Sequence, residues 1–81
     1  MKIKYFAWIK DITNFNEEYL NSNEIKDLDH LKKYIIFKYP DLKKHLNQKI
    51  IRFAVNQEYI IENIKLNKDD EIAVFPPVSG G

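Results

Sequence analysis

The sequence of 81 residues has no cysteine, only one arginine and only two glycines. Without cysteine the chain cannot form a disulfide, a thiolate metal site or a cysteine nucleophile, so any sulfur it handled would have to come from another molecule. Its 13 basic and 12 acidic residues leave a net charge of +1. Because so small a charge gives no overall attraction for polyanions, we expect neither nucleic acid nor an anionic membrane as a partner.

Long apolar runs are missing as well. No segment approaches the length of a membrane span, and residues 1–4 pass into alternation without the apolar core of a signal peptide. These absences predict a cytoplasmic location. With 44% hydrophobic residues in a chain of this length, the composition is that of one globular domain, too small for two independent cores.

Only two histidines are present, His30 and His45, and neither has a carboxylate at a spacing typical of metal ligands. We interpret both as solvent-facing or satisfied polar residues. The sequence therefore predicts no metal site, and it offers no histidine in a setting typical of a general acid or base.

The chain begins with a strand pattern. Alternation over residues 2–9 predicts a strand with one face toward the core, while the other face carries two aromatic side chains, Phe6 and Trp8. Residues 11–16 are interpreted as a turn, and residues 17–20 as a weak second strand.

A helix is predicted over residues 27–38, with Asp27 as its N-cap. Three apolar residues recur in it at helical spacing and should face the core: Leu28, Leu31 and Ile35. Pro40 ends the helix, and residues 41–48 are expected to be a polar connection with at most a short helical turn.

After residue 50 the period returns to two. Three strands joined by two turns are predicted there, with strands at 51–55, 59–61 and 71–75 and turns at 56–57 and 68–70. In the last strand, Ala73 and Phe75 should lie on the face opposite to the core.

This order of elements predicts an α+β roll with β-grasp, or ubiquitin-like, topology, in which one main helix crosses one face of a mixed sheet. We assign residues 1–75 to the β-grasp domain and residues 76–81 to an extended C-terminal tail. The fold alone does not name a function, because one fold serves many.

The C-terminal tail has the composition of a narrow, extended segment that can enter a pocket. Pro76 and Pro77 hold the chain extended, while Gly80 and Gly81 have no β-carbon to obstruct a close approach. Its six residues reach roughly 19 Å when extended. Such a tail can place the Gly81 carboxylate deep inside a pocket of another protein.

Residues 70–81, together with residues 53–57 and 5–7, closely resemble the MoaD family, the small subunits of molybdopterin synthase. The likeness spans the whole chain, including its length. Its most specific part is the ending Phe-Pro-Pro-Val-Ser-Gly-Gly at 75–81, because related β-grasp sulfur carriers of thiamine synthesis share the glycines but usually not the two prolines.

The resemblance implies a sulfur carrier. In that family an ATP-dependent, ubiquitin-activating-type (MoeB-like) enzyme adenylates the terminal carboxylate, which becomes a thiocarboxylate and donates sulfur to cyclic pyranopterin monophosphate in the large (MoaE-like) subunit. Here Gly81 would carry the sulfur and Gly80 would give clearance. The resemblance further implies a heterotetramer of two small and two large subunits, no cofactor held stably by the chain itself, and no catalysis by the chain alone.

The same resemblance places the large-subunit interface on the open sheet face, at Phe6, Tyr59 and Phe75. The tail residues Pro76, Pro77, Val78 and Ser79 are expected to bind the partner as well. Because the first and last strands are neighbours in a β-grasp sheet, Phe6 and Phe75 should share one exposed apolar patch at the root of the tail. Trp8 departs from the family pattern and is either an extra contact or local packing.

Three other interpretations stay open. A thiamine-pathway (ThiS-like) carrier would use the same terminal chemistry with a different acceptor. A protein-conjugating ubiquitin-like modifier would join Gly81 to lysines of other proteins. An interaction domain with an inert tail would lose nothing when the two terminal glycines are removed.

Overall fold

Five strands form one mixed sheet in the order β2-β1-β5-β3-β4. The computed structural model describes residues 1–21 and 23–77. The strands are β1 (Lys2–Tyr5), β2 (Glu17–Tyr19), β3 (Arg52–Val55), β4 (Glu58–Ile60) and β5 (Glu71–Phe75). Strands β1 and β5 pair in parallel at the centre, and the other neighbours pair antiparallel. This is the predicted β-grasp order, with the first and last strands side by side.

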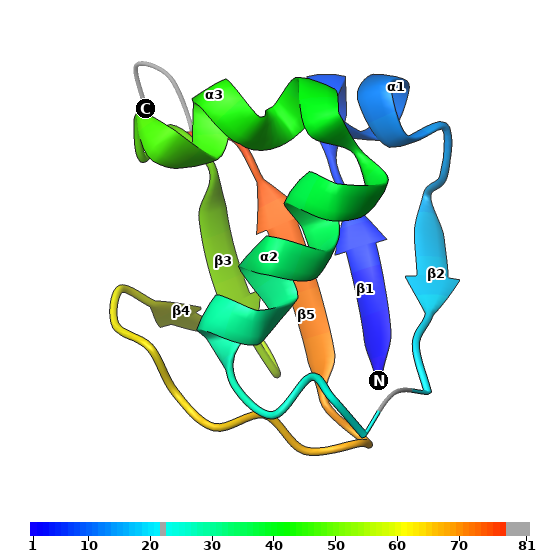
Figure 1. Ribbon diagram of the computed structural model, residues 1–81, viewed down its shortest axis with the longest axis vertical. Coiled ribbons are helices and arrows are strands. Elements are labelled where there is room, and N and C mark those ends of the chain that lie inside the picture. Colours follow the sequence, from blue (N-terminus) through cyan, green and yellow to red (C-terminus); the bar gives the residue numbers. More distant parts are fainter. Residues whose placement is uncertain (22, 78–81) are drawn as a thin grey trace.

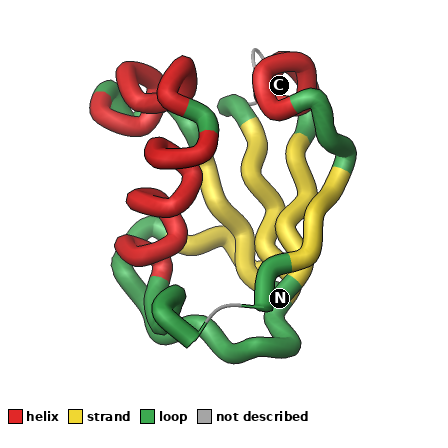
Figure 2. The backbone as a smooth tube through the Cα atoms, turned by 45° about the vertical axis from the view of Figure 1, so that its right-hand side comes forward, coloured by secondary structure: helices red, strands yellow, loops and turns green. Residues whose placement is uncertain are grey.

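One helix, α2 (Leu28–Lys38), crosses one face of the sheet, as Figure 1 shows. The short helices η1 (Pro40–Leu42) and α3 (Lys43–Asn47) follow it, so the connection expected at 41–48 is mostly helical. In the turned view of Figure 2, α2 and the helical segment that follows it form one layer and the sheet forms the other, while α1 (Ala7–Thr13) lies at one end of the strands. Among the residues that the structure describes, no helix crosses the opposite face of the sheet in either view, and the candidate site lies on that face.

The core lies between these layers. The predicted phases are confirmed, since β5 buries Ile72 and Val74 while β3 buries Phe53 and Val55. The buried apolar set is Ile3, Tyr5, Ile9, Ile25, Leu28, Leu31, Ile35, Leu42, Ile51, Phe53, Val55, Leu66, Ile72 and Val74. Burial of this apolar surface is the main force that holds helix and sheet together.

The predicted N-cap of α2 is confirmed. The Asp27 carboxylate accepts a hydrogen bond of 2.8 Å from the backbone N–H of His30, which satisfies one of the free donors of the first turn. This hydrogen bond holds the pKa of Asp27 below its usual value. At the other end, Pro40 starts the 3₁₀ turn that ends the helix.

The hairpin turn at Asn56 and Gln57 is also confirmed. Both residues have positive φ, 51° and 71°, the pattern of the tight turns that match the twist of paired strands. The Asn56 side chain donates to Asp70 at 2.9 Å and accepts from the backbone N–H of Glu71 at 3.0 Å. The turn is therefore tied to the start of β5.

The prediction of a strand over residues 2–9 was wrong beyond Tyr5. Residues Ala7–Thr13 form helix α1, so the turn expected at 11–16 is confined to its last residues. Ala7 has a φ of 55°, which turns the chain out of β1, and Asn14 at 66° ends the helix. Both Ile9 and Thr13 are buried, and their spacing of four is helical.

A hydrogen-bonded cluster joins edge strand β2 to α2. The Glu18 carboxylate accepts from the hydroxyl of Tyr39 at 2.6 Å, from the hydroxyl of Tyr34 at 3.2 Å and from Lys38 Nζ at 3.3 Å. Burial, followed by the hydrogen bond to Glu18, raises the pKa of Tyr39 to about 12. Because β2 has only three residues, this carboxylate is a main attachment of the strand to the helical layer.

We expect Glu18→Gln to destabilise the fold by about 1–3 kcal/mol, because three donors lose a charged acceptor at a largely buried site. The free energy of unfolding in urea measures the effect, and absorbance titration should show a lowered Tyr39 pKa. Glu17→Gln is the matched control, since Glu17 is exposed and its contacts with Lys2 and with the Tyr19 hydroxyl lie at the surface. Equal losses of unfolding free energy in both variants would contradict the role of Glu18 as an attachment of β2 to the helical layer.

Candidate protein-binding surface

The open face of the sheet has a charged half. Lys2 lies 3.0 Å from Glu17, and Lys4 lies 2.6 Å from Glu71, linking β1 to the strand on each side. The hydrogen bond from Lys4 lowers the pKa of Glu71, and the one to Glu17 raises the pKa of Lys2. These side chains satisfy one another, so this half is an ordinary solvated sheet surface.

The other half is apolar. Phe6, Ala7, Ala73, Phe75, Pro76 and Pro77 line a shallow depression of about 530 Å³. The backbone N–H of Phe6 donates to the carbonyl of Val74 at 3.1 Å, which holds Phe6 beside the end of β5. Phe6 remains 45% exposed. As the sequence predicted, Phe6 and Phe75 share an exposed patch where the tail leaves the sheet.

Tyr59 extends this patch across the sheet. Its ring centroid lies 6.4 Å from that of Phe75, and the two rings are inclined by 47°. In the ladder, Ala54 pairs with Tyr59 on one side and with Ala73 on the other. The two small residues, Ala54 and Ala73, form a low floor beside the aromatic rings. We call Phe6, Tyr59, Ala73, Phe75, Pro76 and Pro77 the tail-root patch.

Trp8 is not part of this patch. It was predicted on the same sheet face as Phe6, but it lies in α1, half-buried, with its ring centroid 4.7 Å from that of His45. Helix α1 turns it toward the α3 side because Ala7 ends the strand alternation. These contacts support local packing as the role of Trp8.

The two histidines have different settings. His30 accepts a hydrogen bond of 3.2 Å from the backbone N–H of Lys26. His45 was expected to be solvent-facing or satisfied, yet its Nδ1 is buried and has no hydrogen-bond partner among residues 1–21 and 23–77. In that same part of the chain, no three His, Asp or Glu side chains gather as a metal-binding group.

Four predicted site residues, Val78, Ser79, Gly80 and Gly81, lie outside the described residues. The site that the structure shows is thus the root of the tail and the surface around it.

No helix in the described ranges has the length and apolarity needed to cross a bilayer.

Sequence reasoning missed two features of this surface. Ala7 lines the depression through its positive φ, whereas the alternation of residues 2–9 had placed it in the core. Ala73 was assigned to the correct face but not to the site. The sequence did contain a signal for Ala73, because this small residue lies two positions before Phe75 on the same face of the strand. A small residue beside an aromatic ring on an open face leaves room for a partner.

Comparison with known proteins gives one family. The ThiS family model matches residues 3–81. The human molybdopterin synthase sulfur carrier subunit is 41% identical over 85 residues, covering 100% of this chain and 93% of the relative. The corresponding Dictyostelium discoideum subunit is 37% identical over 90 residues, covering 99% and 94%.

Solved structures agree. SAMP1 from Haloferax volcanii has a TM-score of 0.80 at 21% identity, covering 99% of this chain and 97% of that one, and supports the fold alone. A complex of subunits 1 and 2 of the molybdopterin-converting factor from Helicobacter pylori contains a chain with a TM-score of 0.67 at 26% identity. That match covers 99% of this chain and 96% of the other.

We expect Phe75→Ala to cost about 1 kcal/mol or less in stability, because Phe75 lies on the open face. Phe53→Ala, on the buried face of β3 at 3% exposure, should cost about 3–5 kcal/mol. Urea unfolding of both variants checks the strand phase. Equal costs would mean that Phe75 belongs to the core.

Proposed function

Since this chain belongs to the ThiS/MoaD family of ubiquitin-like sulfur carriers, we propose that it is the sulfur carrier subunit of a molybdopterin synthase. The observation that carries the proposal is the ending Phe-Pro-Pro-Val-Ser-Gly-Gly set directly after an exposed apolar patch at the end of β5. The identities to full-length subunits of that name support it. The two prolines of this ending and these identities favour a molybdopterin synthase subunit over a thiamine-pathway carrier.

The proposed chemistry takes place at the Gly81 carboxylate. A free carboxylate is a poor electrophile, so one of its oxygens first attacks the α-phosphorus of ATP and releases pyrophosphate. A persulfide donor then attacks the acyl carbon of the adenylate and AMP leaves, which gives an acyl disulfide. A thiol of the partner cleaves its sulfur–sulfur bond, so the thiocarboxylate is released and the two donor sulfurs are left as a disulfide. Transfer of this sulfur to the pterin precursor, with water supplying the replacement oxygen, regenerates the carboxylate. Two such cycles supply the two sulfurs of the dithiolene.

In this proposal the chain brings the reactive end to catalytic groups that its partners supply. Gly80 and Gly81 give clearance in a narrow pocket, and Pro76 and Pro77 keep the approach extended. Val78 and Ser79 would lie along the entrance of that pocket. The adenylating enzyme binds the ATP, so this chain needs no cofactor of its own.

The tail-root patch is the proposed docking surface for the large subunit. Exposed aromatic side chains around a low apolar floor are typical anchors of protein interfaces. The Helicobacter pylori complex, which joins subunits 1 and 2 of its converting factor, supports a partner of this kind. We propose a pairing of this kind for the present chain, in the cytoplasm and with two small and two large subunits.

Deletion of Gly81, or Gly81→Ala, is expected to abolish sulfur transfer while leaving the unfolding temperature unchanged. Intact mass after incubation with the activating enzyme, ATP and a sulfur donor should rise by about 16 Da in the wild type, as sulfur replaces oxygen. The deletion variant should show no such gain. A pterin precursor that is still thiolated by the deletion variant would refute the proposal.

The acceptor is tested by reconstitution with two purified partners, a large molybdopterin synthase subunit and a thiazole synthase. We expect sulfur to reach the pterin precursor only. Transfer to the thiazole synthase, with the pterin left unchanged, would assign the chain to thiamine synthesis. A ladder of high-mass conjugates that depends on Gly81 would instead indicate a protein modifier.

Phe75→Ala should weaken binding of the large subunit by about 1–3 kcal/mol, because it removes an interface anchor. Calorimetric titration of the folded variant measures this loss. Tyr19→Ala is a suitable control, since Tyr19 is 73% exposed on the open face but lies in the charged half. A comparable loss in both would argue against the tail-root patch as the docking surface.

A further inference from the structure

A second recess opens beside the tail-root patch, at the edge of the sheet. Strand β4 ends at Ile60 opposite Phe53, so the first residue of β3, Arg52, has no neighbour from β4. The resulting cleft of about 270 Å³ is lined by Leu28, Lys32, Leu46, Lys49, Ile51, Arg52, Phe53, Tyr59, Ile60 and Ile61. Arg52 pairs with Phe75 in the ladder, so the cleft lies at the tail end of the sheet.

The charged residues that line this cleft are all cationic: Lys32, Lys49 and Arg52. Within residues 1–21 and 23–77, none of the three forms an ion pair, whereas Lys2, Lys4 and Lys38 each have a carboxylate partner. Lys32 instead places its Nζ 5.5 Å from the centre of the Phe53 ring. An anion that enters the cleft therefore meets cationic residues and no carboxylate among the lining residues that the structure describes.

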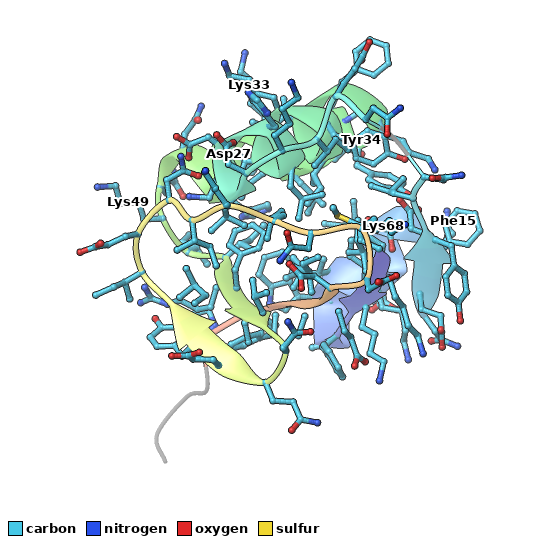
Figure 3. The ribbon with its side chains drawn as sticks, turned by 90° about the horizontal axis from the view of Figure 1, so that it is seen from below. Phe15, Asp27, Lys33, Tyr34, Lys49 and Lys68 are labelled. Carbon is cyan, nitrogen blue, oxygen red and sulfur yellow. The ribbon has the colours of Figure 1, made fainter. Side chains whose placement is uncertain are left out.

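The backbone of two of these residues is held by hydrogen bonds. Lys49 has a φ of 58°, and its N–H donates to the carbonyl of Leu46, closing helix α3. Arg52 is held in β3 by its pairing with β5. Figure 3 shows Lys49 projecting outward at this edge, while Lys33 projects from α2 on the far side of the helical layer. The cleft is therefore a defined feature and is separate from the general scatter of surface lysines.

The shape and floor of the cleft favour an acidic side chain of a protein over a bare anion. Leu28, Ile51 and Phe53 are buried at its base, so the aliphatic part of a glutamate or aspartate would be covered while its carboxylate meets the arginine fork. The cleft also shares Tyr59 with the tail-root patch. A partner that contacts Tyr59 on the patch therefore lies next to the cleft.

We propose that this cleft receives an acidic side chain of the large subunit and so fixes the orientation in which that subunit sits on the tail-root patch. The inference rests on the proposed function, because it assumes the same partner. It adds a recognition element that is electrostatic, directional and distinct from the apolar anchors.

The test compares two double variants with the same change in net charge. The cleft variant carries Lys49→Glu and Arg52→Glu. The control carries Lys33→Glu and Lys68→Glu, both exposed and outside the cleft. At about 50 mM salt the cleft variant should bind the purified large subunit about tenfold or more weakly, and the control within about twofold. At about 500 mM salt the difference should shrink, because screening weakens the charge pairing.

Several outcomes would overturn the inference. Equal losses in the two double variants would show a general charge effect. Unchanged binding of the cleft variant, with Phe75→Ala still impaired, would remove the cleft and leave the proposed function standing. Failure of the wild type to bind the large subunit would instead remove both.

The same protein variants distinguish two other possible ligands of the cleft, a small anion and the activating enzyme, from the large subunit. Inorganic phosphate that saturates the cleft in an amide-shift titration, without competing with the large subunit, would indicate a small-anion site. A cleft variant impaired only in adenylation would indicate the activating enzyme as the partner. Either result contradicts the proposal. Thermal unfolding of every variant confirms that losses of binding do not arise from losses of fold.

Discussion

The parallel pairing of β1 with β5 is the constraint on which the rest depends. It sets Ile3 beside Ile72 and Tyr5 beside Val74, which buries one face of both strands, and it leaves Phe6 hydrogen-bonded to the end of β5. A slip of one residue would exchange the two faces and bury Phe75 in place of Val74. The root of the tail, and the apolar surface around it, therefore exist because the core of the sheet is in this register.

Much of this arrangement could be predicted from the sequence where one periodicity dominates. The helix from Leu28 to Lys38 has a cap, a buried stripe and a following proline, and each signal agrees with the others. The strand over residues 71–75 alternates cleanly, so the outward position of Phe75 followed at once. The pairing of Phe6 with Phe75 needed only the topology. In these places local preference and tertiary packing require the same structure.

The remainder could not be predicted because it depends on backbone conformations or contacts that leave little trace in the sequence. Ala7 takes a positive φ that its residue type disfavours, and this single residue converts the second half of an expected strand into a helix. The basic cleft joins Lys32 of α2, Lys49 of the turn after α3 and Arg52 of β3, and no periodicity connects them. The low floor beside Tyr59 likewise requires the β3 ladder to place Ala54 between Tyr59 and Ala73.

The two surfaces make different physical contributions if the chain acts as we propose. An apolar patch attracts any complementary surface but fixes no direction, because the hydrophobic effect depends on area and not on angle. A tail that must enter one pocket needs its carrier oriented as well as bound. A charged contact set to one side of the patch supplies that second point of attachment, and two separated points define how the domain is turned. Because charge pairing at an exposed edge is weak in salt, the same arrangement lets a carrier leave once its sulfur has been delivered.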